Sequence, residues 1–100
     1  MENKIIVIVD SDLEDLIPGF LMNRENDLVK LKESLSANDF ETIRIIGHSM
    51  KGFGSGYGFD FISEVGFELE KSAKQKQVEE IETHIKSIED YLQTIEIRYE

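Results

Sequence analysis

The sequence contains no cysteine, which excludes disulfides, thiolate metal sites and cysteine nucleophiles. Its N-terminal apolar run, Ile5–Val9, is too short for a secretory signal or a membrane span, so the expected location is cytoplasmic. Basic residues are scarce, because 11 lysines and arginines stand against 21 aspartates and glutamates, and the net charge is −10. Nucleic acids and anionic membrane surfaces repel a chain of this charge, which leaves a protein as the expected partner.

The sequence also lacks internal repeats, a proline-rich or serine-rich linker and a long block of like charge. Its 100 residues, 40% of them hydrophobic, suffice for one modest core and leave no room for a second. We therefore expect a single domain over residues 1–100, with an extended N-terminal arm, residues 1–9, and a helical part, residues 10–100. Two placements of the arm stay open: along the helices, or paired with another copy of itself through its strand edges.

Hydrophobic periodicity organises the first part of the helical region. Residues 10–12 can cap a short helical turn that runs to Leu16. Apolar residues spaced by three, four or seven then predict a helix over residues 18–35, in which Arg24 interrupts the apolar stripe. A further helix is predicted over residues 39–58 by the same spacing.

Two more helices follow in the second half of the chain. One covers residues 60–74 with Asp60 as its cap, and the last covers residues 78–99 with the most regular pattern in the sequence. Because loops of a few residues join the four long helices, we expect an all-α fold: an antiparallel up-down-up-down four-helix bundle with a short N-terminal helix and the extended arm. A homodimeric coiled coil through the last helix is an alternative. Its three heptads are marginal, however, and the bundle needs the same stripe as core, so a monomer is expected.

The helix over residues 39–58, with Ser36 or Asn38 as its cap, carries a histidine on its polar face. Its apolar stripe consists of Phe40, Ile43, Ile46, Met50, Phe53 and Tyr57. At about 100° per residue, His48 falls almost opposite the centre of this stripe near Met50, so the ring is predicted to face solvent. This position argues against a histidine satisfied in the core, and an idle surface histidine remains as the alternative.

The neighbours of His48 on the same helix face indicate a reactive site. They are Arg44, Ile45, Lys51, Gly52 and Ser55. A neutral imidazole is a nucleophile toward phosphorus near neutral pH, and the Lys51 ammonium would lie near the transferred oxygens. Gly52 inside a helix costs about 1 kcal/mol relative to alanine, which indicates that a partner approaches closely there. Ile45 would supply an apolar contact for docking.

Four alternating glycines, Gly52, Gly54, Gly56 and Gly58, raise the possibility of a phosphate-binding loop for a nucleotide. Such loops follow a strand and open a helix, whereas these glycines close a helix, and no Gly-Lys-Ser/Thr sequence occurs. Close packing of a neighbouring helix is the preferred explanation of these glycines. No ATP site, metal ligand set or cofactor is therefore expected.

The segment Gly47-His48-Ser49-Met50-Lys51-Gly52, followed by Gly58 and by Leu69-Glu70, resembles the signature of histidine phosphotransfer domains. Residues 16–21 and 35–40 are also similar to parts of that family, so the resemblance covers most of the chain. It implies a four-helix bundle on which a surface histidine accepts a phosphoryl group from a receiver aspartate or a sensor kinase. The group then passes to the aspartate of a response regulator.

The resemblance also implies roles for individual residues. His48 would be the phosphoacceptor, Lys51 would assist electrostatically, and Gly52 would give the partner room. Arg44, Ile45 and Ser55 belong to the expected docking surface, and Ser55 stands where many members of the family have another small residue. The family leaves Mg²⁺ and most of the chemistry to the receiver, so the chain is expected to be a phosphocarrier rather than a stand-alone enzyme.

Two other features carry less weight. Residues 5–12 are similar to the first strand and acidic pair of receiver domains, but the later strands of a receiver are missing. His84 lies on the polar side of the last helix without comparable neighbours and is interpreted as an idle residue. The second function that stays open is a non-phosphorylated helical interaction module that binds a receiver or kinase domain.

Overall fold

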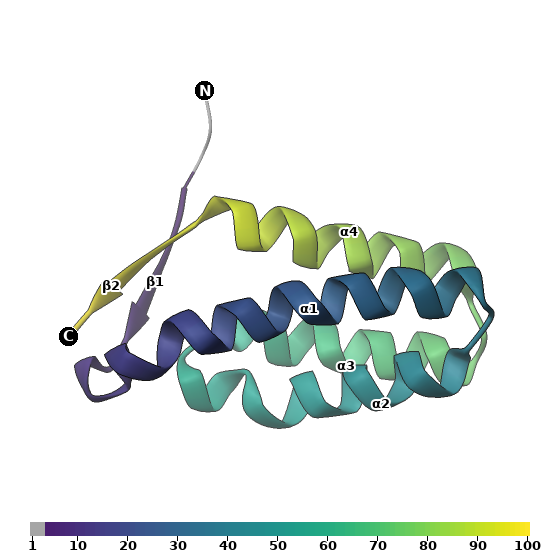
Figure 1. The fold of residues 1–100 in the computed structure, drawn as a ribbon, viewed down its shortest axis with the longest axis horizontal. Coiled ribbons are helices and arrows are strands. Elements are labelled where there is room, and N and C mark those ends of the chain that lie inside the picture. Colours follow the sequence, from purple (N-terminus) through teal and green to yellow (C-terminus); the bar gives the residue numbers. More distant parts are fainter. Residues whose placement is uncertain (1–3) are drawn as a thin grey trace.

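In the computed structural model, which describes residues 4–100, four α-helices lie side by side and two short strands lie beyond one end of them (Figure 1). The α-helices are α1 (Ile17–Ser36), α2 (Phe40–Phe53), α3 (Asp60–Lys74) and α4 (Val78–Thr94). The other elements are β1 (Ile5–Val9), β2 (Ile95–Tyr99) and the 3₁₀ helices η1 (Ser11–Leu16) and η2 (Ser55–Tyr57). The all-α class is confirmed for the main body of the chain, to which the structure adds a short strand pair.

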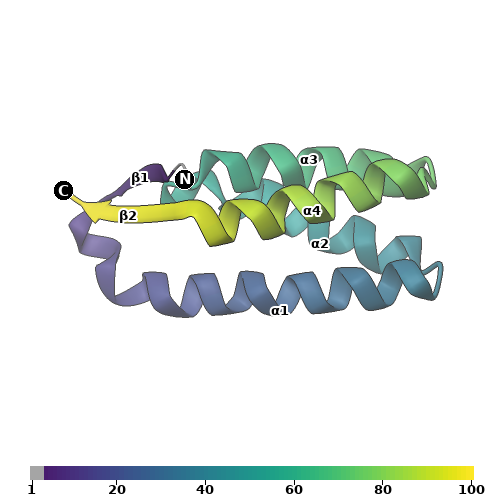
Figure 2. The same ribbon diagram turned by 90° about the horizontal axis from the view of Figure 1, so that it is seen from above.

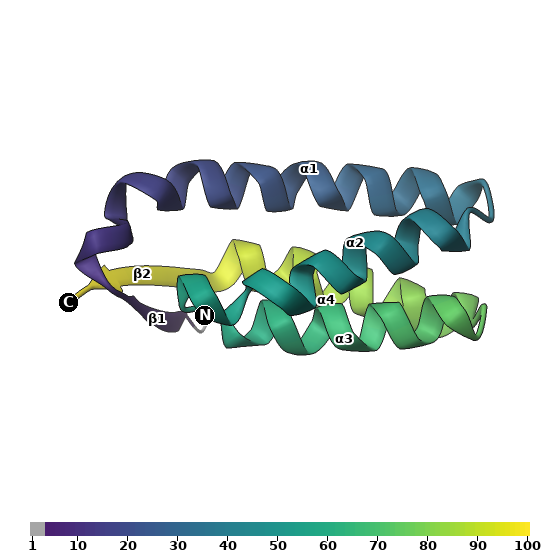
Figure 3. The same ribbon diagram turned by 90° about the horizontal axis from the view of Figure 1, so that it is seen from below.

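Consecutive α-helices contact each other, and α1 also contacts α4. The views in Figures 2 and 3 show that the strand pair extends from the end at which α1 begins and α4 stops. Apolar side chains from all four helices and from β1 are buried together in one core. Within residues 4–100, no helix combines the length and the apolar character that crossing a membrane requires.

Two glycines let α2 and α3 pack unusually closely. A β-carbon added to Gly47 would lie 2.7 Å from the backbone nitrogen of Glu70, and one added to Gly66 would lie 2.5 Å from that of Lys51. Side chains at either position would therefore force the two helices apart. Figure 3 shows α2 lying against α3 along this contact, which brings residues of the two helices together at the surface.

Arg24, the predicted interruption of the α1 stripe, is buried in the structure. Its guanidinium carbon lies 4.6 Å from the centre of the Phe20 ring and 4.2 Å from that of Phe53. Its Nε donates a hydrogen bond of 2.9 Å to Asp27, so the buried charge has both an anion and two aromatic rings beside it. Burial raises the pKa of Asp27 in spite of this pairing.

The predicted last helix over residues 78–99 is wrong in its final turn and a half, because the helix ends at Thr94 and Ile95–Tyr99 forms β2. A spacing of four fits the helical stripe, but residues 95–99 also alternate apolar and polar side chains as a strand does. The apolar strand β1 pairs with residues 95–99, and this pairing favours the strand over the helix. The two strands run parallel, with Ile5 opposite Ile95 and Val9 opposite Tyr99.

The pairing gives the N-terminal arm a partner that neither expected placement named. β1 pairs with the C-terminal strand of its own chain, so all the helices together form the crossover that two adjacent parallel strands need. Val7 and Val9 face the core, while Ile6 and Ile8 remain exposed. Residues 1–3 of the expected arm lie outside the described residues.

The helix ends around α2 also differ from the expectation. Asp39 caps α2 by accepting a hydrogen bond of 3.1 Å from the Thr42 backbone, in place of Ser36 or Asn38. The helix stops at Phe53, and Gly58 ends η2 instead, with a left-handed φ of 93° that suits glycine. Asp60 lies in the first turn of α3, whose N-cap is Phe59. Short polar residues are common on both sides of a helix start, so their type alone does not fix the boundary.

Candidate functional site

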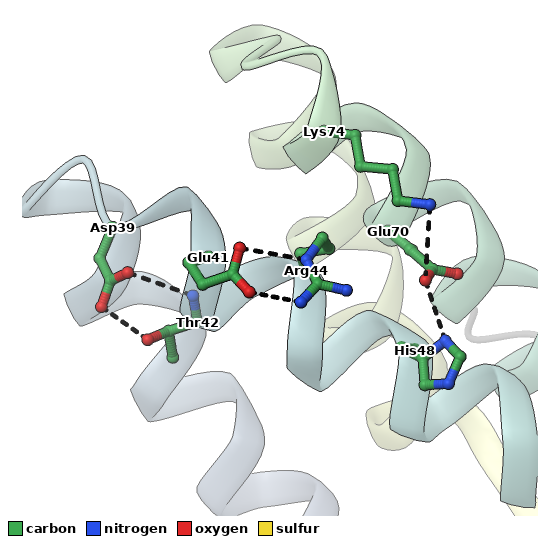
Figure 4. Close-up of polar contacts among 7 residues, drawn as sticks. All are labelled: Asp39, Glu41, Thr42, Arg44, His48, Glu70 and Lys74. Carbon is green, nitrogen blue, oxygen red and sulfur yellow. Dashed lines mark hydrogen bonds and ion pairs between the residues drawn. The ribbon is translucent and has the colours of Figure 1, made fainter.

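His48 lies in the third turn of α2, and its side chain is 63% exposed, which confirms the solvent-facing position predicted from the spacing. Its ring is nevertheless held in place. Nδ1 lies 2.9 Å from Oε2 of Glu70 on α3, as Figure 4 shows. The close approach of α2 and α3 at Gly47 and Gly66 makes this contact possible.

Glu70 is the residue of the site that spacing on α2 could not reveal. Its side chain is only 9% exposed, and its carboxylate receives His48 at Oε2 and the Lys51 ammonium at Oε1, each at 2.9 Å. Lys74 lies farther away, 3.9 Å from Oε2. The hydrogen bond from Lys51, helped by that from His48, holds the pKa of Glu70 below its usual range against the opposite effect of burial.

A sequence signal for Glu70 exists in retrospect. On α3 it falls in line with Gly66, four residues before it, and with Ala73, three residues after it. A carboxylate in a row of small residues at the edge of an apolar stripe points to a buried acid facing a neighbouring helix. The identity of that helix and of the facing residue, His48, required the structure.

The Glu70 carboxylate determines which nitrogen of His48 is free. An ionised carboxylate only accepts hydrogen bonds, so the neutral ring carries its proton on Nδ1 and keeps a lone pair on Nε2. In Figure 4 the second ring nitrogen is directed away from Glu70. The exposed imidazole therefore presents a nucleophilic nitrogen to solvent, while a buried anion supports the opposite side of the ring.

Lys51 and Gly52 lie about one turn beyond His48 on α2. The Lys51 ammonium is bound to Glu70 and lies 5.9 Å from the centre of the Phe67 ring, so it stands beside the imidazole without being free. A β-carbon on Gly52 would have nothing within 4 Å, so the chain's own packing does not require this glycine. Space for an approaching partner explains it better.

The packing explanation of the alternating glycines is corrected by the same measure. Only Gly54 is needed for helix packing, since its added β-carbon would lie 2.6 Å from the backbone nitrogen of Ser63. Gly58 is required by its left-handed φ, and Gly52 and Gly56 face open space.

The expected docking residues lie in different settings. Ile45 is 50% exposed, and Phe67 on α3, which the sequence did not single out, is 49% exposed. Arg44 forms an ion pair with Glu41 of its own helix. Ser55 lies in η2, beyond the end of α2, so its predicted place on the helix face of His48 is wrong; its backbone N–H donates a 2.8 Å hydrogen bond to Ser63.

Comparison of the chain with protein-family models, with curated proteins and with solved structures finds no match. Within residues 4–100, no group of three or more histidine and carboxylate side chains is arranged to hold a metal ion. The described site consists of an exposed ring nitrogen, a buried carboxylate, a neighbouring ammonium and two exposed apolar side chains.

Proposed function

We propose that this chain is a histidine phosphotransfer domain that carries a phosphoryl group on Nε2 of His48. The observation that carries the proposal is the hydrogen bond between His48 Nδ1 and the buried Glu70 carboxylate, which leaves Nε2 exposed. The resemblance of residues 47–52 to the signature of that family supports it from the sequence. The phosphoryl group arrives from a receiver aspartate or a sensor kinase and leaves to the aspartate of a response regulator.

The transfer of the phosphoryl group needs only His48 and the phosphorylated aspartate of the receiver as reactants. The Nε2 lone pair attacks the phosphorus of an aspartyl phosphate, the N–P bond forms, and the P–O bond to the aspartate breaks to release its carboxylate. No proton has to leave Nε2, because the ring proton is on Nδ1. The positive charge that develops on the ring faces the Glu70 carboxylate, as an aspartate supports the histidine of a serine protease. Transfer onward reverses the same bonds.

The residues around the ring divide the remaining tasks. Lys51 stands close enough to turn from Glu70 toward the phosphoryl oxygens, and its positive charge offsets their negative charge. Ile45 on α2 and Phe67 on α3 offer exposed apolar contacts, and Gly52 leaves space for the loop that carries the aspartate. The receiver supplies the divalent cation and most of the chemistry.

The four helices of this domain form an antiparallel up-down-up-down bundle. The turns between them are short, consecutive helices contact one another, and α1 closes the ring with α4, which all support this arrangement. The domain acts as a monomer in the cytoplasm, with receiver and sensor kinase domains as its partners.

A small phosphoryl donor tests the chemistry without any partner. Incubated with phosphoramidate, the protein should gain one acid-labile, base-stable phosphate, detected by ³¹P NMR and by mass. His48→Gln should gain none, whereas His84→Gln, the matched control on α4, should be labelled as the wild type is. Labelling that persists in His48→Gln would refute the assignment. Receiver binding that survives His48→Gln, without phosphate on any variant, would instead support the interaction module.

A further inference from the structure

A polar groove lies beside His48, between the start of α2 and the end of α3. Its volume is about 480 Å³, and it is lined by Asn38, Asp39, Phe40, Glu41, Arg44, Ala73, Lys74 and Lys76. Arg44 lies one helical turn before His48 on α2, and Lys74 lies one turn after Glu70 on α3. Figure 4 shows Lys74 and His48 reaching the same Glu70 carboxylate from different sides. Lys74 therefore links the groove to the site, because it lines the groove and contacts Glu70.

Some charged side chains of the groove have close partners within the chain, and others do not. Asp39 accepts two hydrogen bonds from Thr42, at 3.1 and 2.6 Å, and Glu41 is paired with Arg44. Within residues 4–100, Lys74 is held only by a 3.9 Å contact to Glu70, and its side chain is 59% exposed. Lys76 is exposed and forms no ion pair among the residues that the structure describes. Two lysines are thus available to bind an anion.

The position of these cations is unusual for so acidic a chain. With a net charge of −10, the protein repels an acidic partner at long range, so productive contact needs local positive charge at the place of contact. Arg44 and Lys74 provide that charge one helical turn from the phosphate-accepting ring and from its supporting carboxylate, and Lys76 adds to it just beyond the end of α3. We call these three residues and the groove between them the cationic groove.

We infer that the cationic groove binds acidic side chains of the protein that exchanges phosphate with His48. This inference rests on the proposed function, because a partner that holds Mg²⁺ next to a phosphorylated aspartate carries several carboxylates at that place. A carboxylate of the partner replaces Glu41 on Arg44 and draws Lys74 away from Glu70. Lys51 stays on Glu70 during docking, so the ring of His48 keeps its orientation until phosphate arrives.

Charge reversal in the groove tests the inference. The probes are a receiver domain that exchanges phosphate with His48 and a short polyglutamate peptide, which needs no phosphate. The double variant Lys74→Glu/Lys76→Glu should bind the receiver about tenfold more weakly at low salt, and its affinity should depend less on salt. In the wild type, the peptide should shift the amide resonances of residues 38–44 and 73–76, and the double variant should lose these shifts.

Matched variants separate groove binding from general charge effects. Lys30→Glu reverses one charge on α1, outside the groove, which is half of the change in the double variant, and should change receiver affinity less than twofold. Glu41→Gln releases Arg44 and should tighten binding about twofold to threefold. Phosphoramidate labelling of His48 should remain unchanged in Lys30→Glu, and the amide spectra of all these variants should show that they are folded.

The outcomes distinguish failure of the inference from failure of the proposed function. If the double variant binds the receiver as tightly as Lys30→Glu does while phosphoramidate still labels His48, the groove is not the acidic contact and the phosphocarrier stands. If phosphoramidate labels none of the proteins on His48, the proposed function fails. Peptide shifts in residues 38–44 and 73–76 would then still show an acid-binding groove, and their absence would remove it as well.

Discussion

Glu70 Oε2 lies 2.9 Å from Nδ1 of His48, although 22 residues separate them in the sequence. A buried carboxylate is thus joined to an exposed imidazole, and the helix contact that joins them is made without side chains, at Gly47 and Gly66. This relationship makes the ring of His48 both accessible and oriented. The first prediction follows from it directly.

Without the Glu70 carboxylate, the ring of His48 should no longer be held in the tautomer that is protonated on Nδ1. In Glu70→Ala, the neutral ring is free to carry its proton on Nε2, which blocks the nucleophilic lone pair. We expect phosphoramidate to label Glu70→Ala about tenfold to hundredfold more slowly than the wild type. The labelling rate of Glu70→Gln should lie between those of Glu70→Ala and the wild type. Ring ¹⁵N chemical shifts check the cause, because they report which nitrogen is protonated. An unchanged tautomer together with an unchanged rate would show that Glu70 is not a positioning residue.

The lowered pKa of Glu70 predicts how stability depends on pH. A carboxylate whose pKa is depressed on folding stabilises the folded state above its unfolded pKa of about 4.5, and this contribution is lost as pH falls through the folded value. The difference in free energy of unfolding between wild type and Glu70→Gln should therefore be largest at neutral pH and shrink in acid. Urea unfolding from about pH 7 to about pH 3 measures it.

The control for this prediction lies on the same helix. Glu68 is exposed and forms no ion pair among the described residues, so the Glu68→Gln curve should parallel that of the wild type. A stability difference for Glu70→Gln that stays constant with pH would show that the carboxylate gains nothing from Lys51 and His48.

The exposed position of His48 could be predicted from the sequence, since an apolar stripe on one face of a helix defines the opposite face. Local spacing does not extend across helices, so it could not pair Glu70 with His48. The end of α4 was mispredicted for another reason. Residues 95–99 satisfy both the helical and the strand period, and the partner that selects the strand, Ile5–Val9, lies at the other end of the chain. Arg24 interrupts the apolar stripe of α1, and only the structure shows that its guanidinium packs against the rings of Phe20 and Phe53.

The cap of α2 gives a third prediction. Asp39→Ala should lower the free energy of unfolding, because the Thr42 backbone N–H loses its acceptor and the negative charge leaves the start of α2. Asp39→Asn should recover most of this loss. Ser36→Ala, at a position that the sequence alone offers as a cap, should change stability little. Chemical unfolding that ranks Ser36→Ala below Asp39→Ala in stability would contradict the cap seen here.

The last prediction contrasts two glycines of α2. Gly52→Ala should raise the free energy of unfolding by roughly 0.5 to 1 kcal/mol, because alanine favours the helix and the added methyl group meets nothing within 4 Å. Gly47→Ala should destabilise the protein, since its methyl group would overlap the α3 backbone at Glu70 and separate the two helices. Thermal unfolding of both variants measures these opposite effects.

The same pair separates access from orientation in phosphate transfer. Gly52→Ala should accept phosphate from phosphoramidate at the wild-type rate but from a receiver more slowly, because the methyl group obstructs only a large donor. Gly47→Ala should slow both reactions, since displacing Glu70 disturbs the ring whatever the donor. A Gly52→Ala protein that takes phosphate from the receiver at full rate would mean that this glycine gives the partner no room that it needs.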